Sequence, residues 1–131
     1  MSDRGDAARI VAGAYDAVGR GDIAGLFALI ASDAVWHVPG GSPLAGSHRG
    51  HDAIRGFLGA LRERSSGTMR VQLDELTVGE RSVVALQRVT ATREERSLDV
   101  SMCVVYRVSN GLLVDARYYV DELAQYDAFW S

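Results

Sequence analysis

The sequence predicts an α+β fold, in which a cone-like, curved antiparallel sheet wraps around three N-terminal helices and encloses a pocket. Apolar residues recur at helical spacing in the first half of the chain, and the period changes to that of strands from Thr68 onward. Short turn signals separate the strand-like runs, which favours antiparallel neighbours. With 131 residues, the chain is expected to form one domain, 1–131.

Three helices are expected before the strands. The first covers residues 6–19 and ends near Gly19–Gly21, with an apolar face of Ile10, Val11, Ala14 and Val18. Asp22 can cap a second helix, which carries Ile23, Leu26, Phe27 and Ile30. The third begins around His51–Asp52, and its apolar stripe is Ile54, Phe57, Leu58 and Leu61.

Strands occupy most of the remaining chain. Residues 34–38 form a short strand that Pro39–Gly40 stops. Four longer runs follow at 69–78, 82–93, 97–108 and 112–121. Asn110–Gly111 predicts a type I′ hairpin, because both turn residues need positive φ. Residues 123–130 are expected to form one more helical turn or a tail.

Composition excludes several classes of function. A net charge of −3 leaves no basic footprint for nucleic acid or for a membrane surface. No apolar run is long enough to span a membrane, and the charged N-terminal segment predicts no signal peptide. The single cysteine, Cys103, indicates a reducing cytoplasm. All basic residues are arginines, which excludes Schiff-base chemistry and lysine-tethered cofactors.

Four short motifs carry a resemblance to a known family. They are Gly21–Asp22, Ser32–Trp36 leading to Pro39–Gly40, Leu44–Gly46 with Arg49–Gly50, and Ala116–Asp121. Because these motifs occur in this order and spacing, the chain resembles the SnoaL-like and ketosteroid-isomerase-like proteins of the nuclear transport factor two superfamily. The resemblance implies a deep pocket between the helices and the concave sheet face, and a homodimer through the outer face. The superfamily contains isomerases, polyketide cyclases, epoxide hydrolases, dehydratases and non-catalytic binders, so it leaves the reaction open.

The family's catalytic residues are mostly missing at the matching positions. The ketosteroid isomerase base falls on Val38, its aspartate donor near Cys103, and its tyrosine near Ala14. Tyr15 is the next residue, about 100° around the helix. Of the Asp-Arg-Asp set of limonene-type epoxide hydrolases only the arginine remains, at Arg88, with the aspartate positions on Thr90 and Tyr118. The acid–base aspartate of SnoaL-type cyclases also falls on Tyr118.

Strand alternation supplies candidate site residues. Arg88 shares a face with Val84, Leu86 and Thr90. It therefore either binds a ligand oxygen in the pocket, forms an ion pair with an Asp or Glu, or lies at the rim of the cone. Tyr118 either donates to a developing oxyanion or is a core tyrosine. His48, in the loop, is the candidate base, whereas His37 is expected to face away from the pocket. The predicted ligand-binding residues are Trp36, Val38, Thr90, Cys103, Ala116 and Val120.

Other polar residues receive structural interpretations. Asp121 is expected to cap the C-terminal turn, unless a bulge brings it to the pocket. Cys103 is also consistent with a buried, inert thiol. The histidines lack the spacing of metal motifs, so no metal and no cofactor are expected.

The sequence therefore predicts a protein that binds a small apolar or carbonyl-bearing molecule. If it is an enzyme, cofactor-free isomerase, cyclase or dehydratase chemistry is expected, with Arg88, Tyr118 and His48 as catalytic residues. The alternative is a non-catalytic binding or accessory protein, since the acid–base carboxylates are missing. A third possibility is a dimerisation module, with an outer apolar face of Val104, Tyr106 and Val108.

Overall fold

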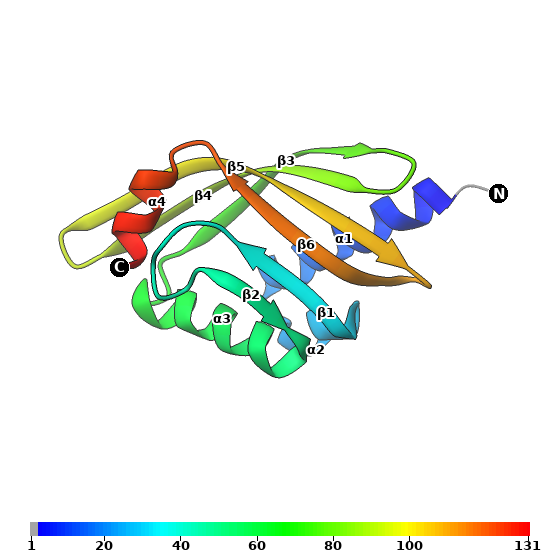
Figure 1. Ribbon diagram of the computed structural model, residues 1–131, viewed down its shortest axis with the longest axis horizontal. Coiled ribbons are helices and arrows are strands. Elements are labelled where there is room, and N and C mark those ends of the chain that lie inside the picture. Colours follow the sequence, from blue (N-terminus) through cyan, green and yellow to red (C-terminus); the bar gives the residue numbers. More distant parts are fainter. Residues whose placement is uncertain (1–2) are drawn as a thin grey trace.

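The computed structural model describes residues 3–131 and confirms the α+β class, with four helices and one six-stranded, curved, unclosed sheet (Figure 1). The helices are α1 (Asp3–Arg20), α2 (Ile23–Phe27), α3 (Gly50–Arg64) and α4 (Leu123–Trp130). The strands are β1 (Ile30–Val38), β2 (Gly46–Arg49), β3 (Arg70–Val78), β4 (Val83–Arg93), β5 (Arg96–Ser109) and β6 (Leu112–Val120). Met1 and Ser2, part of the segment that predicts no signal peptide, lie outside the described residues.

The predicted helices form, with two corrections. The Asp22 carboxylate accepts a 2.9 Å hydrogen bond from the Gly25 N–H and so caps α2, as expected. This helix ends at Phe27, and Ile30 already belongs to β1, so its predicted place on the helix is wrong. Val18 was expected on the buried face of the first helix, but its side chain is 44% exposed.

The sheet has the strand order β2-β1-β6-β5-β4-β3. All neighbours are antiparallel except β1 and β6, which run parallel, so the predicted all-antiparallel sheet is corrected at this junction. The edge strand β2 was not predicted, because its four residues lie in a segment rich in turn residues. Asn110 and Gly111 have φ values of 52° and 78°, as the predicted hairpin turn requires.

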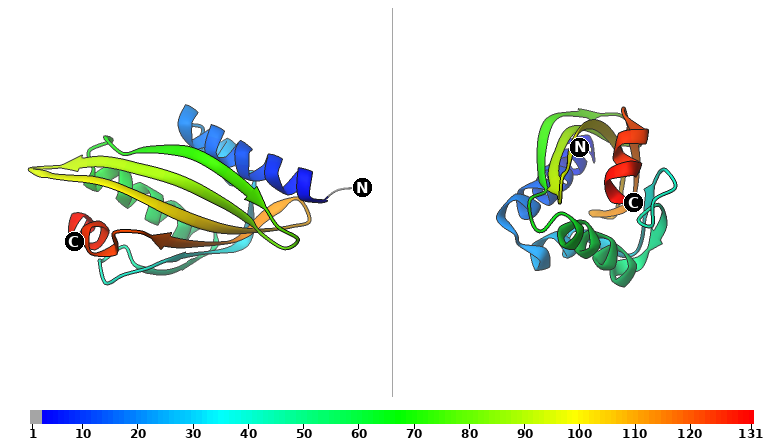
Figure 2. Two further views of the ribbon diagram at one scale, coloured as in Figure 1. Left: turned by 90° about the horizontal axis from the view of Figure 1, so that it is seen from above. Right: turned by 90° about the vertical axis from the view of Figure 1, so that its left-hand side faces the viewer.

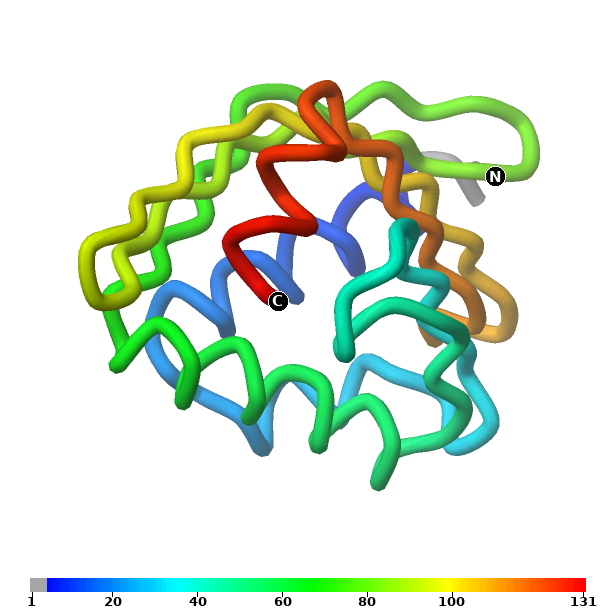
Figure 3. The backbone as a smooth tube through the Cα atoms, turned by 60° about the vertical axis from the view of Figure 1, so that its left-hand side comes forward, coloured from blue at the N-terminus to red at the C-terminus, as the bar shows by residue number. Residues whose placement is uncertain are grey.

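Seen end-on, the curved sheet and the helices α1 and α3 surround a common core (Figure 2). The C-terminal segment forms a helix, α4, rather than a tail. It lies at one end of the core that the sheet, α1 and α3 surround (Figure 3). Guanidinium groups hold its carbonyl end: Arg64 donates to the Trp130 carbonyl at 2.9 Å, and Arg93 to the Phe129 carbonyl at 2.8 Å. No helix within residues 3–131 is long and apolar enough to cross a membrane.

Candidate functional site on the concave face

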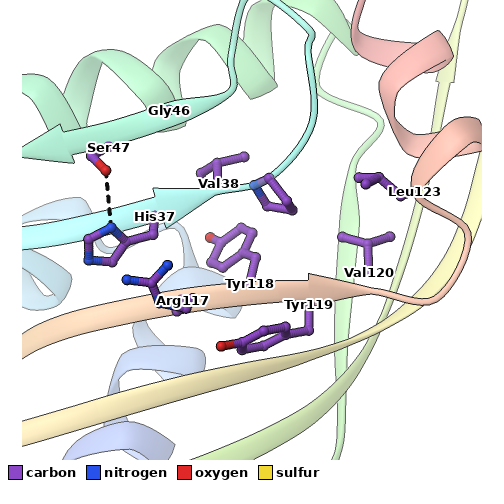
Figure 4. A pocket seen from close by; sticks show the side chains of 10 residues that line it. His37, Val38, Gly46, Ser47, Arg117, Tyr118, Tyr119, Val120 and Leu123 are labelled. Atoms are coloured by element: carbon purple, nitrogen blue, oxygen red, sulfur yellow. Dashed lines mark hydrogen bonds between the residues drawn. The ribbon is translucent and has the colours of Figure 1, made fainter.

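The concave face of β1 and β6 carries an aromatic wall. Trp36 pairs with Ala116 across the parallel strands, and both side chains are buried. Tyr118 follows two residues later and so points to the same face, where its ring meets Phe57 of α3 at a centroid distance of 6.2 Å. The structure thus places five predicted site residues on the concave face: Trp36, Val38, Ala116, Tyr118 and Val120. Figure 4 shows three of them, Val38, Tyr118 and Val120. Their role in ligand binding stays a prediction.

His48 joins this wall from the edge strand. It lies directly opposite Trp36 in the antiparallel β1–β2 pair, so the two side chains share the concave face. Its ring stacks on Phe57 with a centroid distance of 4.7 Å and an interplanar angle of 26°. Its Nε2 lies 2.9 Å from the carbonyl oxygen of Leu44. A carbonyl only accepts, so Nε2 carries the hydrogen and Nδ1 of the neutral ring is left as the basic nitrogen.

A chain of buried polar side chains crosses the same interior. The hydroxyl of Tyr106 on β5 donates to that of Tyr15 on α1 at 2.8 Å, and the Tyr15 hydroxyl donates to the Oε1 of Gln87 on β4. The rings of Tyr106 and Trp36 meet edge-on at 6.3 Å, which connects this chain to the aromatic wall. Sequence reasoning missed all three hydrogen-bonded residues. Tyr15 is one residue after the position matching the family's tyrosine, Ala14, but its hydroxyl still reaches the interior.

Burial keeps the interior hydroxyls protonated. It raises the pKa of Tyr118 to about 12, and a hydrogen bond from the Trp36 side chain offsets this only in part. Burial likewise raises the pKa values of Tyr15 and Tyr106, because a phenolate is poorly solvated there. At neutral pH these groups are therefore hydrogen-bond donors rather than bases.

Arg88 does not belong to this interior, and its predicted inward orientation is wrong. The buried residues of β4 are the odd-numbered ones, so Arg88 and Thr90 lie on the outer face. There the guanidinium forms a two-point ion pair with Asp99 at 2.6 and 2.8 Å. This pair raises the pKa of Arg88 and lowers that of Asp99. Of the alternatives that the sequence left open for Arg88, the structure shows the ion pair with an acidic residue.

The two faces of β5 are also reversed relative to expectation. Cys103, expected among the ligand-binding residues, pairs with the exposed Leu86 of β4 on the outer face. Val104 and Tyr106 were expected to form an outer apolar face, but both are buried in the core. Val108 follows a register shift after Arg107 and packs against the edge of the core. The outer face of β5 instead carries Ser101, Cys103 and Val105.

The remaining polar candidates lie elsewhere. Asp121 accepts a 3.2 Å hydrogen bond from the Ser101 N–H and does not cap α4, which has Glu122 at its N-cap. His37 faces away from the aromatic wall, as predicted, and contacts Asp115. Within residues 3–131 no group of three or more His, Cys, Asp or Glu is placed to hold a metal ion.

Known proteins share both the sequence pattern and the architecture. Residues 11–116 match the SnoaL-like domain family. An uncharacterized protein of Mycobacterium tuberculosis is 31% identical over 118 residues, which are 89% of this chain and 90% of that protein. The structure of Bal32a, from a soil-derived mobile gene cassette, is 32% identical with a TM-score of 0.96, over 99% of this chain and 100% of that one.

More distant structures share the fold alone. A SnoaL-like, polyketide-cyclase-like protein of Jannaschia sp. CCS1 is 17% identical with a TM-score of 0.80, over 100% of this chain and 96% of that one. The family match runs from α1 into β6, so it includes β1 to β5 and the first half of β6. The chain therefore belongs to the SnoaL-like domain family, and its fold is that of the nuclear transport factor two-like proteins.

Proposed function

We propose that the concave face binds an apolar, carbonyl-bearing small molecule and catalyses a cofactor-free proton transfer next to its carbonyl, as in isomerases, cyclases and dehydratases. The observation that carries this proposal is the pairing of a tautomer-fixed histidine with a neutral tyrosine. His48 presents a basic Nδ1, and Tyr118 stays protonated. Both side chains contact the ring of Phe57, which brings them to one part of the interior.

Each side chain has a separate task in this reaction. His48 Nδ1 takes the proton from the carbon next to the carbonyl. Tyr118 donates a hydrogen bond to the carbonyl oxygen as negative charge develops there. Trp36 supplies an apolar wall and polarises the Tyr118 hydroxyl through its own hydrogen bond. Arg88 has no part in it, because it lies on the other face of the sheet.

Proton abstraction can be tested without a known product. The protein is incubated in D2O with a panel of apolar cyclic ketones and β-keto esters, and deuterium uptake beside the carbonyl is followed by mass spectrometry. His48→Gln is expected to slow exchange by about 10²–10⁴-fold. Tyr118→Phe should slow it by about 10²–10³-fold. Arg88→Gln is the matched control and keeps the wild-type rate; exchange that survives His48→Gln unchanged rejects the assignment.

A second candidate function is non-catalytic ligand binding. One observation favours it: the buried residues of β1, β4, β5 and β6 include no Asp or Glu, and Gln87 and His48 lie among their aromatic and aliphatic side chains. In that case ligands from the same panel change the fluorescence of Trp36, and no deuterium is taken up. The two readouts therefore separate a binding protein from an enzyme.

We also propose a cytoplasmic homodimer that associates through the outer sheet face. Leu86 and Cys103 form a cross-strand pair there, next to Val84 and Val105, and Leu86 is 39% exposed. The one free thiol fits a reducing compartment. Val105→Glu is expected to convert the dimer to a monomer in analytical ultracentrifugation. A wild-type protein that sediments as a monomer at micromolar concentration contradicts this part of the proposal.

A further inference from the structure

Three polar side chains form a row on the outer face of the sheet, opposite the aromatic wall. Ser47 of β2 pairs with His37 of β1, and His37 pairs with Arg117 of β6. Directly opposed residues share a face, so the three side chains are neighbours. Asp115 lies two residues before Arg117 on the same face of β6. Residues from three strands thus meet in one place.

Hydrogen bonds order this row into a relay. His37 Nε2 lies 2.8 Å from Asp115 Oδ1, and His37 Nδ1 lies 3.0 Å from Ser47 Oγ (Figure 4). The carboxylate of Asp115 only accepts, so Nε2 carries the hydrogen. In the neutral ring Nδ1 is then the acceptor, and the Ser47 hydroxyl donates to it. A serine whose proton is held by a carboxylate-oriented histidine is the arrangement of an activated nucleophile.

A groove of about 420 Å³ lies beside the relay. It opens because β1 and β6 separate after the His37–Arg117 pair: Val38 continues along β2, whereas Tyr118–Val120 continue along β5. Ser47, His37 and Arg117 line this groove together with the apolar side chains of Val38, Val120 and Leu123 (Figure 4). Because the two strands separate here, Val38, Tyr118 and Val120 of the concave face also border the groove. Among the side chains of residues 5–131, Arg117 forms no ion pair, so its guanidinium is available to a ligand oxygen.

We propose that Ser47 is the nucleophile of a second, hydrolytic site, which cleaves esters of apolar carboxylic acids. Ser47 Oγ attacks the acyl carbon while its proton passes to His37 Nδ1. The carbon–oxygen bond to the alcohol then breaks, and the alcohol leaves with that proton. Water repeats the sequence on the acyl-serine, which releases the carboxylic acid and restores Ser47. Arg117 donates to the oxyanion, and the apolar wall of the groove holds the acyl chain.

The test is covalent labelling with a fluorophosphonate probe, followed by peptide mass spectrometry, together with hydrolysis of p-nitrophenyl butyrate. The wild-type protein is expected to carry the adduct on Ser47. Ser47→Ala abolishes the adduct, and His37→Gln slows its formation by about 100-fold or more. Asp115→Asn slows it by about tenfold or more, because the histidine loses its fixed tautomer. Ser101→Ala, an exposed serine of the same outer face, is the matched control and labels like the wild type.

The wild-type experiment is decisive even where a variant folds poorly, because it maps the adduct directly. No adduct on Ser47 overturns the proposal, as does equal labelling of folded His37→Gln protein, with folding checked by circular dichroism. The hydrolytic site does not depend on the proton-transfer function, since Ser47, His37 and Asp115 take no part in proton transfer, although Tyr118 also lines the groove. Deuterium exchange without Ser47 labelling therefore rejects this inference alone.

Discussion

The hydroxyl of Tyr106 lies 2.8 Å from that of Tyr15 and donates to it, which links β5, one of the two central strands, to α1. Tyr15 is the central member, because it also donates to Gln87. Tyr15→Phe leaves two buried groups without a hydrogen-bond partner, the Tyr106 hydroxyl and the Gln87 Oε1. It is expected to lower the free energy of unfolding by about 2–3 kcal/mol. Tyr106→Phe removes only the terminal donor and should cost about 1 kcal/mol.

Urea denaturation measures both values. The two substitutions remove the same atom from the same residue type, so each serves as the control for the other. An equal loss of unfolding free energy in the two variants would mean that Tyr15 is not the central member of the Tyr106–Tyr15–Gln87 hydrogen-bond series.

Gly40 is expected to tolerate no side chain. Its φ is +102°, and an added Cβ would lie 2.0 Å from the Oδ1 of Asp127 on α4. Gly40→Ala should therefore cost about 2 kcal/mol or more and lower Tm. Gly41→Ala, one residue later and with nothing within 4 Å of the added Cβ, is the control and should change stability by less than about 0.5 kcal/mol. Similar Tm values for the two variants would contradict the close packing of α4 on this turn.

Alkaline pH is expected to destabilise the fold through the buried phenols. The unfolded chain releases the Tyr118 proton near pH 10, whereas the folded protein keeps it up to about pH 12. The raised pKa of Tyr118 thus contributes on the order of 2 kcal/mol to the free energy of unfolding. This contribution is complete below pH 10 and is lost as the pH rises through 12. Tyr118→Phe should make the free energy of unfolding less steep in pH over this window. Denaturant titrations at several pH values test this, and an unchanged slope would count against a buried Tyr118 hydroxyl.

The outer ion pair of Arg88 is expected to be irrelevant to the interior. Because both partners are exposed, solvent screens their attraction. Arg88→Gln and Asp99→Asn should therefore leave ligand-induced changes in Trp36 fluorescence unchanged. A loss of ligand binding in either variant, with the fold intact, would show that the outer ion pair affects ligand binding at the concave face.

The sequence predicts the element types because the evidence for them is local. Helical spacing, the Asp22 cap and the Asn110–Gly111 turn each act over a few residues, and each appears as expected. The strand β2 is different: it has only four residues, beginning with Gly46 and followed by Gly50, and they have no alternating pattern of their own. It exists because β1 offers an edge with which to pair.

The faces of β4 and β5 could not be assigned from apolar residues alone. Val84, Leu86 and Val105 are apolar and lie outside, while Val83 and Val104 lie inside. A weaker signal was present: the even-numbered residues of β4 include Arg88, Thr90 and Thr92, whereas the odd-numbered set has only Gln87 and the terminal Arg93 as polar residues. The site residues Gln87 and Tyr106 were missed because their assignment depends on this parity. Assignment succeeded on β1 and β6, where polar and apolar residues alternate more cleanly.

The alternation of β1, β2 and β6 makes these strands unusually intolerant of changes in length. Neighbouring residues serve opposite sides: His48 faces the aromatic wall and Ser47 the groove. On β6, Tyr118 contacts Phe57 on the concave face, whereas Arg117 is exposed on the outer face. A single-residue insertion or deletion upstream in a strand would exchange these sides along the rest of it. The serine would then be carried into the core and the histidine out to solvent. Substitutions can alter one surface at a time, but length changes in these strands alter both.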